Sequence, residues 1–173
     1  MNYANIKPFS VENGTGVRVS LFVSGCPFHC EGCFNEEAWN YECGKPFTEA
    51  VIDEIMELLR PDYIAGLTLL GGEPAVKPHQ KALLPLLKRI RKELPGKTVW
   101  LYTGYVYEDF LPGGAACDPE VTASFLENCD VMVDGRFELS KHDVSLVFRG
   151  SSNQRIIDLN RTREQSVLTE LEL

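Results

Sequence analysis

The chain has 173 residues, 44% hydrophobic and 24% charged, a composition typical of a globular protein with a single core. Its 17 basic and 25 acidic side chains leave a formal net charge of −8, which disfavours binding to a phosphate backbone. We therefore expect one domain over residues 1–173, with a polar tail from about residue 161 and no nucleic-acid partner.

The first eight residues lack the apolar core of a signal peptide, and no apolar run is long enough to span a bilayer. We therefore expect a cytoplasmic protein without a membrane partner. In that compartment the six cysteines indicate metal ligands or buried thiols rather than disulfides.

Apolar strands are expected to alternate with amphipathic helices along the chain. Pro85 falls inside the second predicted helix, so that helix either kinks there or begins its regular part there. Residues 140–150 are expected to form an irregular loop, and the tail to be frayed or weakly helical. The predicted order is strand 18–23, helix 48–60, strand 67–70, helix 79–94, strand 98–102, helix 120–128, strand 131–133 and strand 154–159.

This alternation predicts an α/β fold with a parallel sheet covered by helices. The strands are too few to close an eight-stranded barrel, so we expect a partial, open TIM-type barrel with outer helices. Chemistry in such sheets gathers beyond the carboxyl ends of the strands. Four loops that follow predicted strands should therefore meet at one rim, namely residues 26–33, 71–73, 103–104 and 134–135.

Three cysteines, Cys26, Cys30 and Cys33, follow the first predicted strand at the spacing C-x₃-C-x₂-C. Thiolates hold cubane iron–sulfur clusters, usually four to a cluster. Three thiolates on one loop can therefore bind three irons of a [4Fe–4S] cluster and leave the fourth iron open to a small molecule. An open coordination position distinguishes a reactive metal site from a structural one.

A zinc site completed by His29 or Cys43 is an alternative that the spacing leaves open. His29 lies between two ligands and is poorly placed to turn toward the same metal, whereas Cys43 is ten residues beyond Cys33. The isolated Cys43, Cys117 and Cys129 are otherwise expected to be free buried thiols.

The cysteine motif and the later Gly71-Gly72-Glu73-Pro74 together resemble the radical S-adenosylmethionine superfamily. The chain is most similar to the group of that superfamily that activates anaerobic ribonucleoside-triphosphate reductases. The similarity extends over most of the chain, and the flanking segments point to this group more specifically than the cysteines do. Those segments are residues 1–3, 13–18, 21–26, Trp39, 44–48, 95–97, 102–105, 133–137 and 148–154.

The resemblance implies a [4Fe–4S] cluster on Cys26, Cys30 and Cys33, with S-adenosyl-L-methionine as the second cofactor. It implies no catalytic residue beyond the cluster and its ligands. In the wider superfamily the residue before the third cysteine is often aromatic and backs the adenine; here it is Gly32, and Phe34 follows the cysteine instead. The residues expected to contact S-adenosylmethionine are Gly32, Cys33, Phe34, Gly71, Gly72, Glu73, Thr103 and Asp134.

The evidence for these contacts differs from one residue to another. The resemblance assigns residues 71–73 to the amino and carboxylate end of the methionyl group, and Glu73 either bonds within its loop or neutralises the ammonium. Thr103 and Asp134 can offer a hydroxyl and a carboxylate, but ordinary turn chemistry explains them equally well. Residues 148–154 either shape the mouth that receives a partner or form an ordinary loop, and we favour the first.

The implied function is an oxidoreductase that generates a glycyl radical in the large subunit of the anaerobic ribonucleotide reductase, with flavodoxin or a similar protein as electron donor. Two alternatives remain: an activase of another glycyl-radical enzyme (or a small-molecule radical enzyme), and a non-enzymatic cysteine metal or redox module. His79 and His142 are expected at the surface or in caps, and Trp39 and Trp100 in the core.

Overall fold

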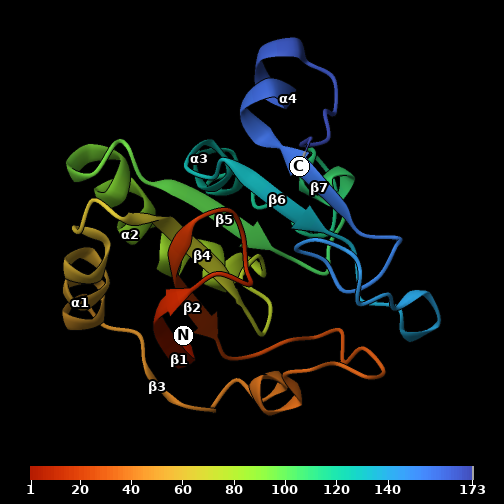
Figure 1. Ribbon diagram of the computed structural model, residues 1–173, viewed down its shortest axis with the longest axis horizontal. Coiled ribbons are helices and arrows are strands. Elements are labelled where there is room, and N and C mark those ends of the chain that lie inside the picture. Colours follow the sequence, from red (N-terminus) through yellow and green to blue (C-terminus); the bar gives the residue numbers. More distant parts are fainter. Residues whose placement is uncertain (173) are drawn as a thin grey trace.

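The computed structural model describes residues 1–172, and one mixed sheet of seven strands organises them (Figure 1). The strands are β1 (Asn2–Ser10), β2 (Val17–Val23), β3 (Lys45–Pro46), β4 (Ile64–Gly71), β5 (Thr98–Tyr102), β6 (Val131–Asp134) and β7 (Arg155–Asp158). The helices are α1 (Glu49–Leu59), α2 (Lys77–Glu93), α3 (Thr122–Glu127) and α4 (Leu159–Gln165). Short 3₁₀ segments cover Glu36–Trp39, Tyr107–Phe110 and Leu139–Lys141.

The strand order is β3-β1-β2-β4-β5-β6-β7. The four central strands β2, β4, β5 and β6 run parallel, whereas β1 and β3 at one edge and β7 at the other run antiparallel to their neighbours. The prediction of an α/β fold with an open sheet is confirmed. The prediction of a parallel sheet is wrong at both edges: residues 11–16 turn the chain back from β1 into β2, and the longer segment 135–154 returns it antiparallel as β7.

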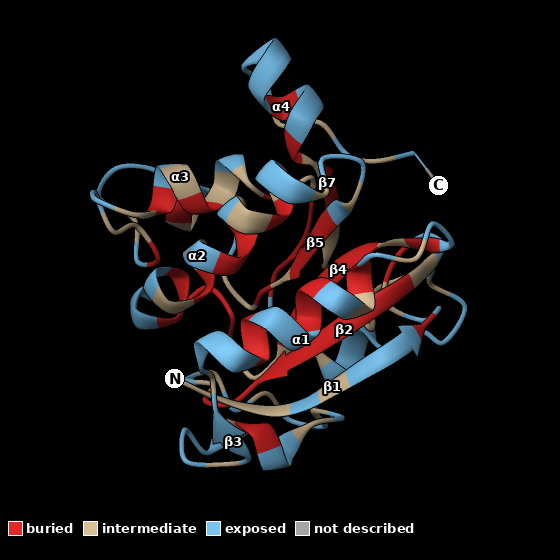
Figure 2. Cartoon of the chain, turned by 90° about the vertical axis from the view of Figure 1, so that its left-hand side faces the viewer, coloured by how far each residue is buried: buried red, intermediate tan, exposed pale blue. Residues whose placement is uncertain are grey.

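The two faces of the sheet bury different side chains because residues alternate along a strand. Val19, Leu21 and Val23 of β2 pack with α1 and α2 in the main core. The opposite face carries Arg18 and Phe22, and Phe22 lines a second hollow described below. Figure 2 shows the helices in front of the buried central strands, with β1 more exposed at the edge.

Strand β1 and the carboxyl-terminal segment depart from the predictions. β1 was not expected, because its polar residues and Pro8 weaken the strand pattern. α2 begins at Lys77 and continues through Pro85, so the regular helix does not begin at that proline. Of the two states predicted for the tail, the helical one is found in part: α4 covers residues 159–165, and the tail is not frayed beyond it, because Leu171 donates its backbone N–H to Ile156 of β7.

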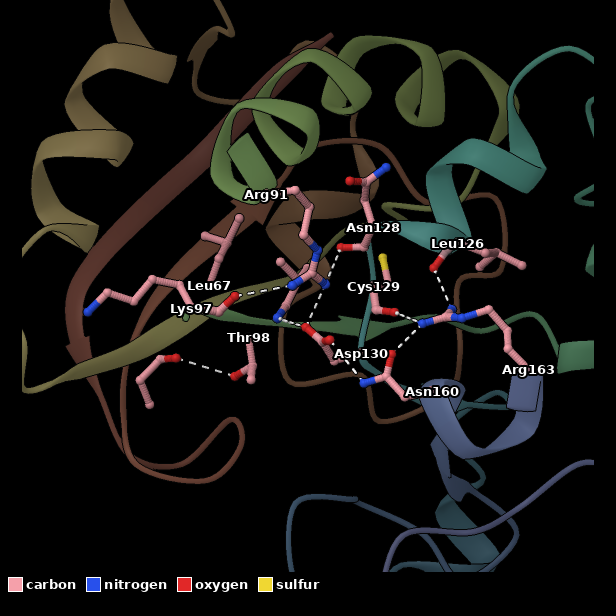
Figure 3. Close-up of polar contacts among 12 residues, drawn as sticks. Leu67, Arg91, Lys97, Thr98, Leu126, Asn128, Cys129, Asp130, Asn160 and Arg163 are labelled. Carbon is pink, nitrogen blue, oxygen red and sulfur yellow. Dashed lines mark hydrogen bonds and ion pairs between the residues drawn. The ribbon is translucent and has the colours of Figure 1, made fainter. Parts of the chain in front are cut away.

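A polar network ties α4 to the amino-terminal ends of β5 and β6 (Figure 3). Asp130 accepts hydrogen bonds from Arg91 of α2 at 2.6 Å, from the backbone N–H of Val99 at 2.7 Å and from Asn160 of α4 at 3.1 Å. Arg163 of α4 donates to the carbonyl oxygens of Leu126 and Cys129. This end of the strands lies opposite the functional loops, so the network supports the sheet rather than the site. None of the helices in residues 1–172 combines the length and apolar character needed to cross a bilayer.

Arg18 is fully buried without a carboxylate partner among residues 1–172. Its guanidinium instead donates five hydrogen bonds to neutral oxygens: the hydroxyl oxygens of Thr68 and Thr98 and the carbonyl oxygens of Thr15, Leu67 and Thr98. Burial lowers its pKa to about 10, so it stays charged at neutral pH. The side chain thereby joins β2, β4 and β5 within the sheet.

We expect Arg18→Met to lower the free energy of unfolding by about 3 kcal/mol, because buried carbonyl oxygens lose their donors. The exposed Lys88→Met on α2 should change it by less than about 0.5 kcal/mol. Anaerobic urea unfolding followed by circular dichroism measures both. Equal stability of Arg18→Met and the wild type would show that water replaces the lost donors.

Candidate metal centre

A cavity of about 530 Å³ lies at the carboxyl ends of the central parallel strands. All four predicted rim loops reach it, and in Figure 1 the arrowheads of β5 and β6 point toward that side of the molecule. The prediction that one topology brings these loops together is confirmed. The residues that the loops contribute to its wall are Cys26, Phe28, Cys30, Gly32, Cys33, Phe34, Gly71, Gly72, Thr103, Gly104, Gly135, Arg136 and Phe137.

The loop that carries Cys26, Cys30 and Cys33, residues 24–35, is named the cysteine loop. All three thiols are half-buried and line the cavity. Gly25 and Gly32 have φ angles of +96° and +73°, which side chains other than glycine rarely adopt, so they let the loop turn back on itself. Burial raises the pKa of Cys26 to about 11, and metal binding must therefore displace its proton.

The donor set fits a cubane cluster better than a single ion. No group of three or more His, Cys, Asp or Glu side chains within residues 1–172 is gathered tightly enough to hold one metal ion. In a cubane each thiolate binds a different iron, so the ligands need not converge on a point. His29 is exposed and stacks on Trp39 with ring centroids 4.6 Å apart, and neither His29 nor Cys43 lines the cavity. The two residues that could complete a zinc site therefore do not stand with the three thiols at this cavity.

The cysteine loop and the 71–73 loop are held together through backbone groups. Gly25 donates its N–H to Ala38 and accepts from the N–H of Glu73, both at 2.7 Å. Gly72 donates to the carbonyl of Val23, also at 2.7 Å. A Cβ added at Gly72 would lie 2.5 Å from the carbonyl oxygen of Gly25. Only a glycine permits this approach, which fixes one loop against the other.

Glu73 bonds within the protein rather than facing the cavity. Its buried carboxylate accepts hydrogen bonds from the backbone N–H groups of Ala75 and Gly104 and from the Thr103 hydroxyl, at 2.7–2.8 Å. Burial raises its pKa to about 7, opposed by these three donors. Two roles were predicted for Glu73: bonding within its loop, or neutralising the ammonium of the ligand. Its hydrogen bonds agree with the first role and extend it, because they link the loops after β4 and β5.

His79 was expected at the surface or in a cap; the surface prediction is wrong, and the side chain supports the same loop. It is buried, and its Nδ1 lies 2.8 Å from the carbonyl oxygen of Glu73. Burial lowers its pKa, so the ring is neutral at pH 7, and Nδ1 donates to the carbonyl. His79 comes from the first turn of α2, so that helix positions the 71–73 loop.

We expect Glu73→Gln to destabilise the fold more at pH 5.5 than at pH 8. The folded-state pKa of Glu73 is about 7 and its ordinary value is 4.5, so between these values the folded protein binds the extra proton. The contribution of Glu73 to stability is complete below pH 4.5 and falls as pH rises through 7, by up to about 1.4 kcal/mol per unit. Anaerobic urea unfolding of both proteins at the two pH values measures the difference. A pH-independent difference would contradict this titration.

Thr103 and Asp134 differ in their access to the cavity. Thr103 lines it, although its hydroxyl proton is donated to Glu73. Asp134 is buried and outside the wall, and its carboxylate accepts from Arg155 and from the backbone N–H of Tyr107. The geometry of Asp134 therefore favours the turn-stabilising role that the sequence left open.

Several wall residues were not singled out from the sequence. Trp39, expected in the core, lines the cavity, and its buried indole N–H has no partner within residues 1–172. Phe28 lies against Gly104 and beneath the guanidinium of Arg136, 4.3 Å from its ring centroid. Trp100 is in the core as predicted. The only sequence feature that could have indicated a role for Phe28 in the cavity wall is its position inside the cysteine motif.

The segment from residue 148 to 154 lies on the cavity wall through Phe148, Arg149, Gly150 and Gln154. The Gln154 amide holds its shape by accepting from Gly150 N–H and donating to the Gly135 carbonyl. His142 also lines the cavity and is exposed, as expected. Cys129 is fully buried and Cys43 and Cys117 half-buried, and none of the three lines the cavity.

The open sheet and its three-thiol cavity define the class of protein that binds a single iron–sulfur cluster beyond the carboxyl ends of parallel strands. A family model described as a 4Fe-4S single cluster domain matches residues 12–157. Among curated relatives, the anaerobic ribonucleoside-triphosphate reductase-activating proteins of Pasteurella multocida and Escherichia coli K12 are each 40% identical over 158 and 159 residues. These alignments cover 90% and 89% of this chain and 96% of each relative. The protein of that name from phage T4 is 38% identical over 156 residues, 90% of this chain and 93% of the relative.

The chain belongs to the family of anaerobic ribonucleoside-triphosphate reductase-activating proteins within the 4Fe-4S single cluster domains. A [4Fe–4S] cluster is its cofactor.

Proposed function

We propose that this protein activates an anaerobic ribonucleoside-triphosphate reductase by generating a glycyl radical in its large subunit. The observation that carries the proposal is the convergence of three cysteines and the Gly71-Gly72 backbone on one cavity. Its volume of about 530 Å³ suits a nucleoside-sized ligand such as S-adenosylmethionine. The family to which the chain belongs supports the reductase as the partner.

The chain's own residues would hold and orient the reactants. Cys26, Cys30 and Cys33 would bind three irons, and backbone at Gly71 and Gly72 would admit the methionyl group closely. When bound, the reduced cluster supplies the one electron that cleaves S-adenosylmethionine to methionine and a 5′-deoxyadenosyl radical, which removes a hydrogen atom from the glycine Cα. The aromatic wall at Phe28 and Trp39 would exclude water from that radical.

Further contacts belong to the same proposal. Gly32, Cys33, Phe34 and Thr103 are the wall residues proposed to touch S-adenosylmethionine, with Glu73 acting through Thr103 and Gly104. Asp134 would act indirectly, by holding the backbone of Tyr107 and so the shape of the loops beside the cavity. We also propose that the chain forms one domain of the partial-barrel kind, which the parallel order of β2, β4, β5 and β6 supports. We propose a flavodoxin-like protein as the electron donor and a cytoplasmic location.

The test is an anaerobic incubation of the reconstituted protein with S-adenosylmethionine, a reductant and the purified large reductase subunit. The expected result is a glycyl-radical signal in the reductase, with methionine and 5′-deoxyadenosine released. A signal only in another glycyl-radical enzyme would favour the first alternative, an activase of a different partner. One bound zinc and no visible absorption would favour a metal module.

A further inference from the structure

A second hollow, of about 640 Å³, adjoins the cluster cavity and is named the side hollow. It lies between β1 and the cysteine loop, with Phe22 of β2 on its floor. The side hollow and the cavity share three wall residues, so they lie side by side. The shared residues are Glu12, Asn13 and Phe34, and the remaining walls of the side hollow are Ala4, Asn5, Lys7, Asn35 and Glu37.

The strand beside this hollow has a free edge. Within residues 1–172, β3 pairs only with Asn2 and Tyr3 of β1, so the outer edge from Ala4 to Lys7 has no neighbouring strand. Figure 2 shows β1 at the boundary of the sheet. A free edge offers backbone N–H and C=O groups to an added strand, and Pro8 limits its length.

The shared wall carries one large apolar side chain, that of Phe34, beside the polar Glu12 and Asn13. Phe34 is 83% exposed although it follows a predicted cluster ligand directly. Next to it, the backbone of the cysteine loop continues to Asn35, whose side-chain N–H group is buried without a partner in residues 1–172. A large exposed aromatic beside unpaired polar groups is typical of a surface that another protein covers.

A glycine inside a polypeptide cannot enter the cavity alone, because its chain must continue away from the cavity on both sides. The side hollow gives one flank such a path, floored by Phe22 and bordered by Asn5 and Lys7 of β1, a strand whose outer edge is unpaired from Ala4 to Lys7 within residues 1–172. We propose that the segment of the reductase on one side of its target glycine lies extended in the side hollow. There it would pair with the edge of β1 and pack an apolar side chain against Phe34. This inference rests on the proposed function.

Asn5→Trp tests the path, because an indole at this exposed position would fill the hollow away from the predicted cluster ligands. We expect glycyl-radical formation to slow at least tenfold at limiting reductase. The reductant-driven cleavage of S-adenosylmethionine without reductase should stay at the wild-type rate, which also shows that the variant folds. Lys88→Trp, on the exposed face of α2, is the matched control and should leave both rates unchanged.

A photo-crosslinking amino acid at position 5 gives a readout independent of activity. We expect it to join the protein to the reductase within the segment that carries the glycine, and the same group at position 88 to give no such product. Wild-type radical formation by Asn5→Trp, or crosslinking at position 5 to the electron donor alone, would overturn the docking path. Absence of a glycyl radical with the wild type would overturn the proposed function and the docking path with it.

Discussion

Replacing any one of Cys26, Cys30 and Cys33 by alanine should abolish binding of the cluster. Each half-buried thiol lines the same cavity from the cysteine loop, and a cubane that loses one of three protein ligands is left with two. Anaerobically reconstituted wild type should contain about four irons and four sulfides per chain, and each variant far less. Cleavage of S-adenosylmethionine should fall below detection in all three variants.

The other cysteines supply the matched controls. Cys43→Ala and Cys117→Ala change half-buried thiols outside the cavity wall and should retain full iron and activity. Cys129 is buried in the core, so Cys129→Ala should retain the cluster at some cost in stability. Loss of the cluster from any of these controls, or its retention in Cys30→Ala, would disprove the ligand assignment.

Gly72→Ala should reduce cleavage of S-adenosylmethionine at least about 100-fold, because errors of about 1 Å in position cost that much. The new Cβ would lie 2.5 Å from the Gly25 carbonyl oxygen and 3.0 Å from that of Ala38. Both are backbone atoms, so the 71–73 loop must move away from the cysteine loop. Steady-state kinetics under anaerobic conditions measures the loss, while iron content reports whether the cluster is still bound.

Gly96→Ala is the control for this substitution. It makes the same chemical change in a turn where a Cβ meets nothing within 4 Å. We expect wild-type kinetics from it. A Gly72→Ala protein with wild-type kinetics would show that the two loops need not be in contact during the reaction.

The sequence predicted the central elements well because each carries a strong local signal. Residues 51–59 repeat apolar side chains at helical spacing and form the buried face of α1, and predicted strand 98–102 matches β5. The convergence of the four loops also followed from strand order alone. The spacing of three cysteines singled out the cysteine loop as a metal site, and the resemblance of the flanking segments was needed to favour an iron–sulfur cluster over zinc.

Long-range contacts were beyond the reach of the sequence. β1 is paired by its neighbours rather than by a strong pattern of its own, and α4 is held by the Asp130 network. The inward position of His79 depends on the path of the 71–73 loop, and the place of Trp39 in the cavity wall depends on where the cysteine loop ends. The sequence around each of these residues does not show which distant residues it will contact.

The most direct test is electron paramagnetic resonance of the reduced protein with and without S-adenosylmethionine. If three cysteines leave one iron of the cluster open, the added ligand will bind that iron and change the g values of the signal. An unchanged spectrum at saturating S-adenosylmethionine, with a side chain of this chain found on the fourth iron, would contradict the account.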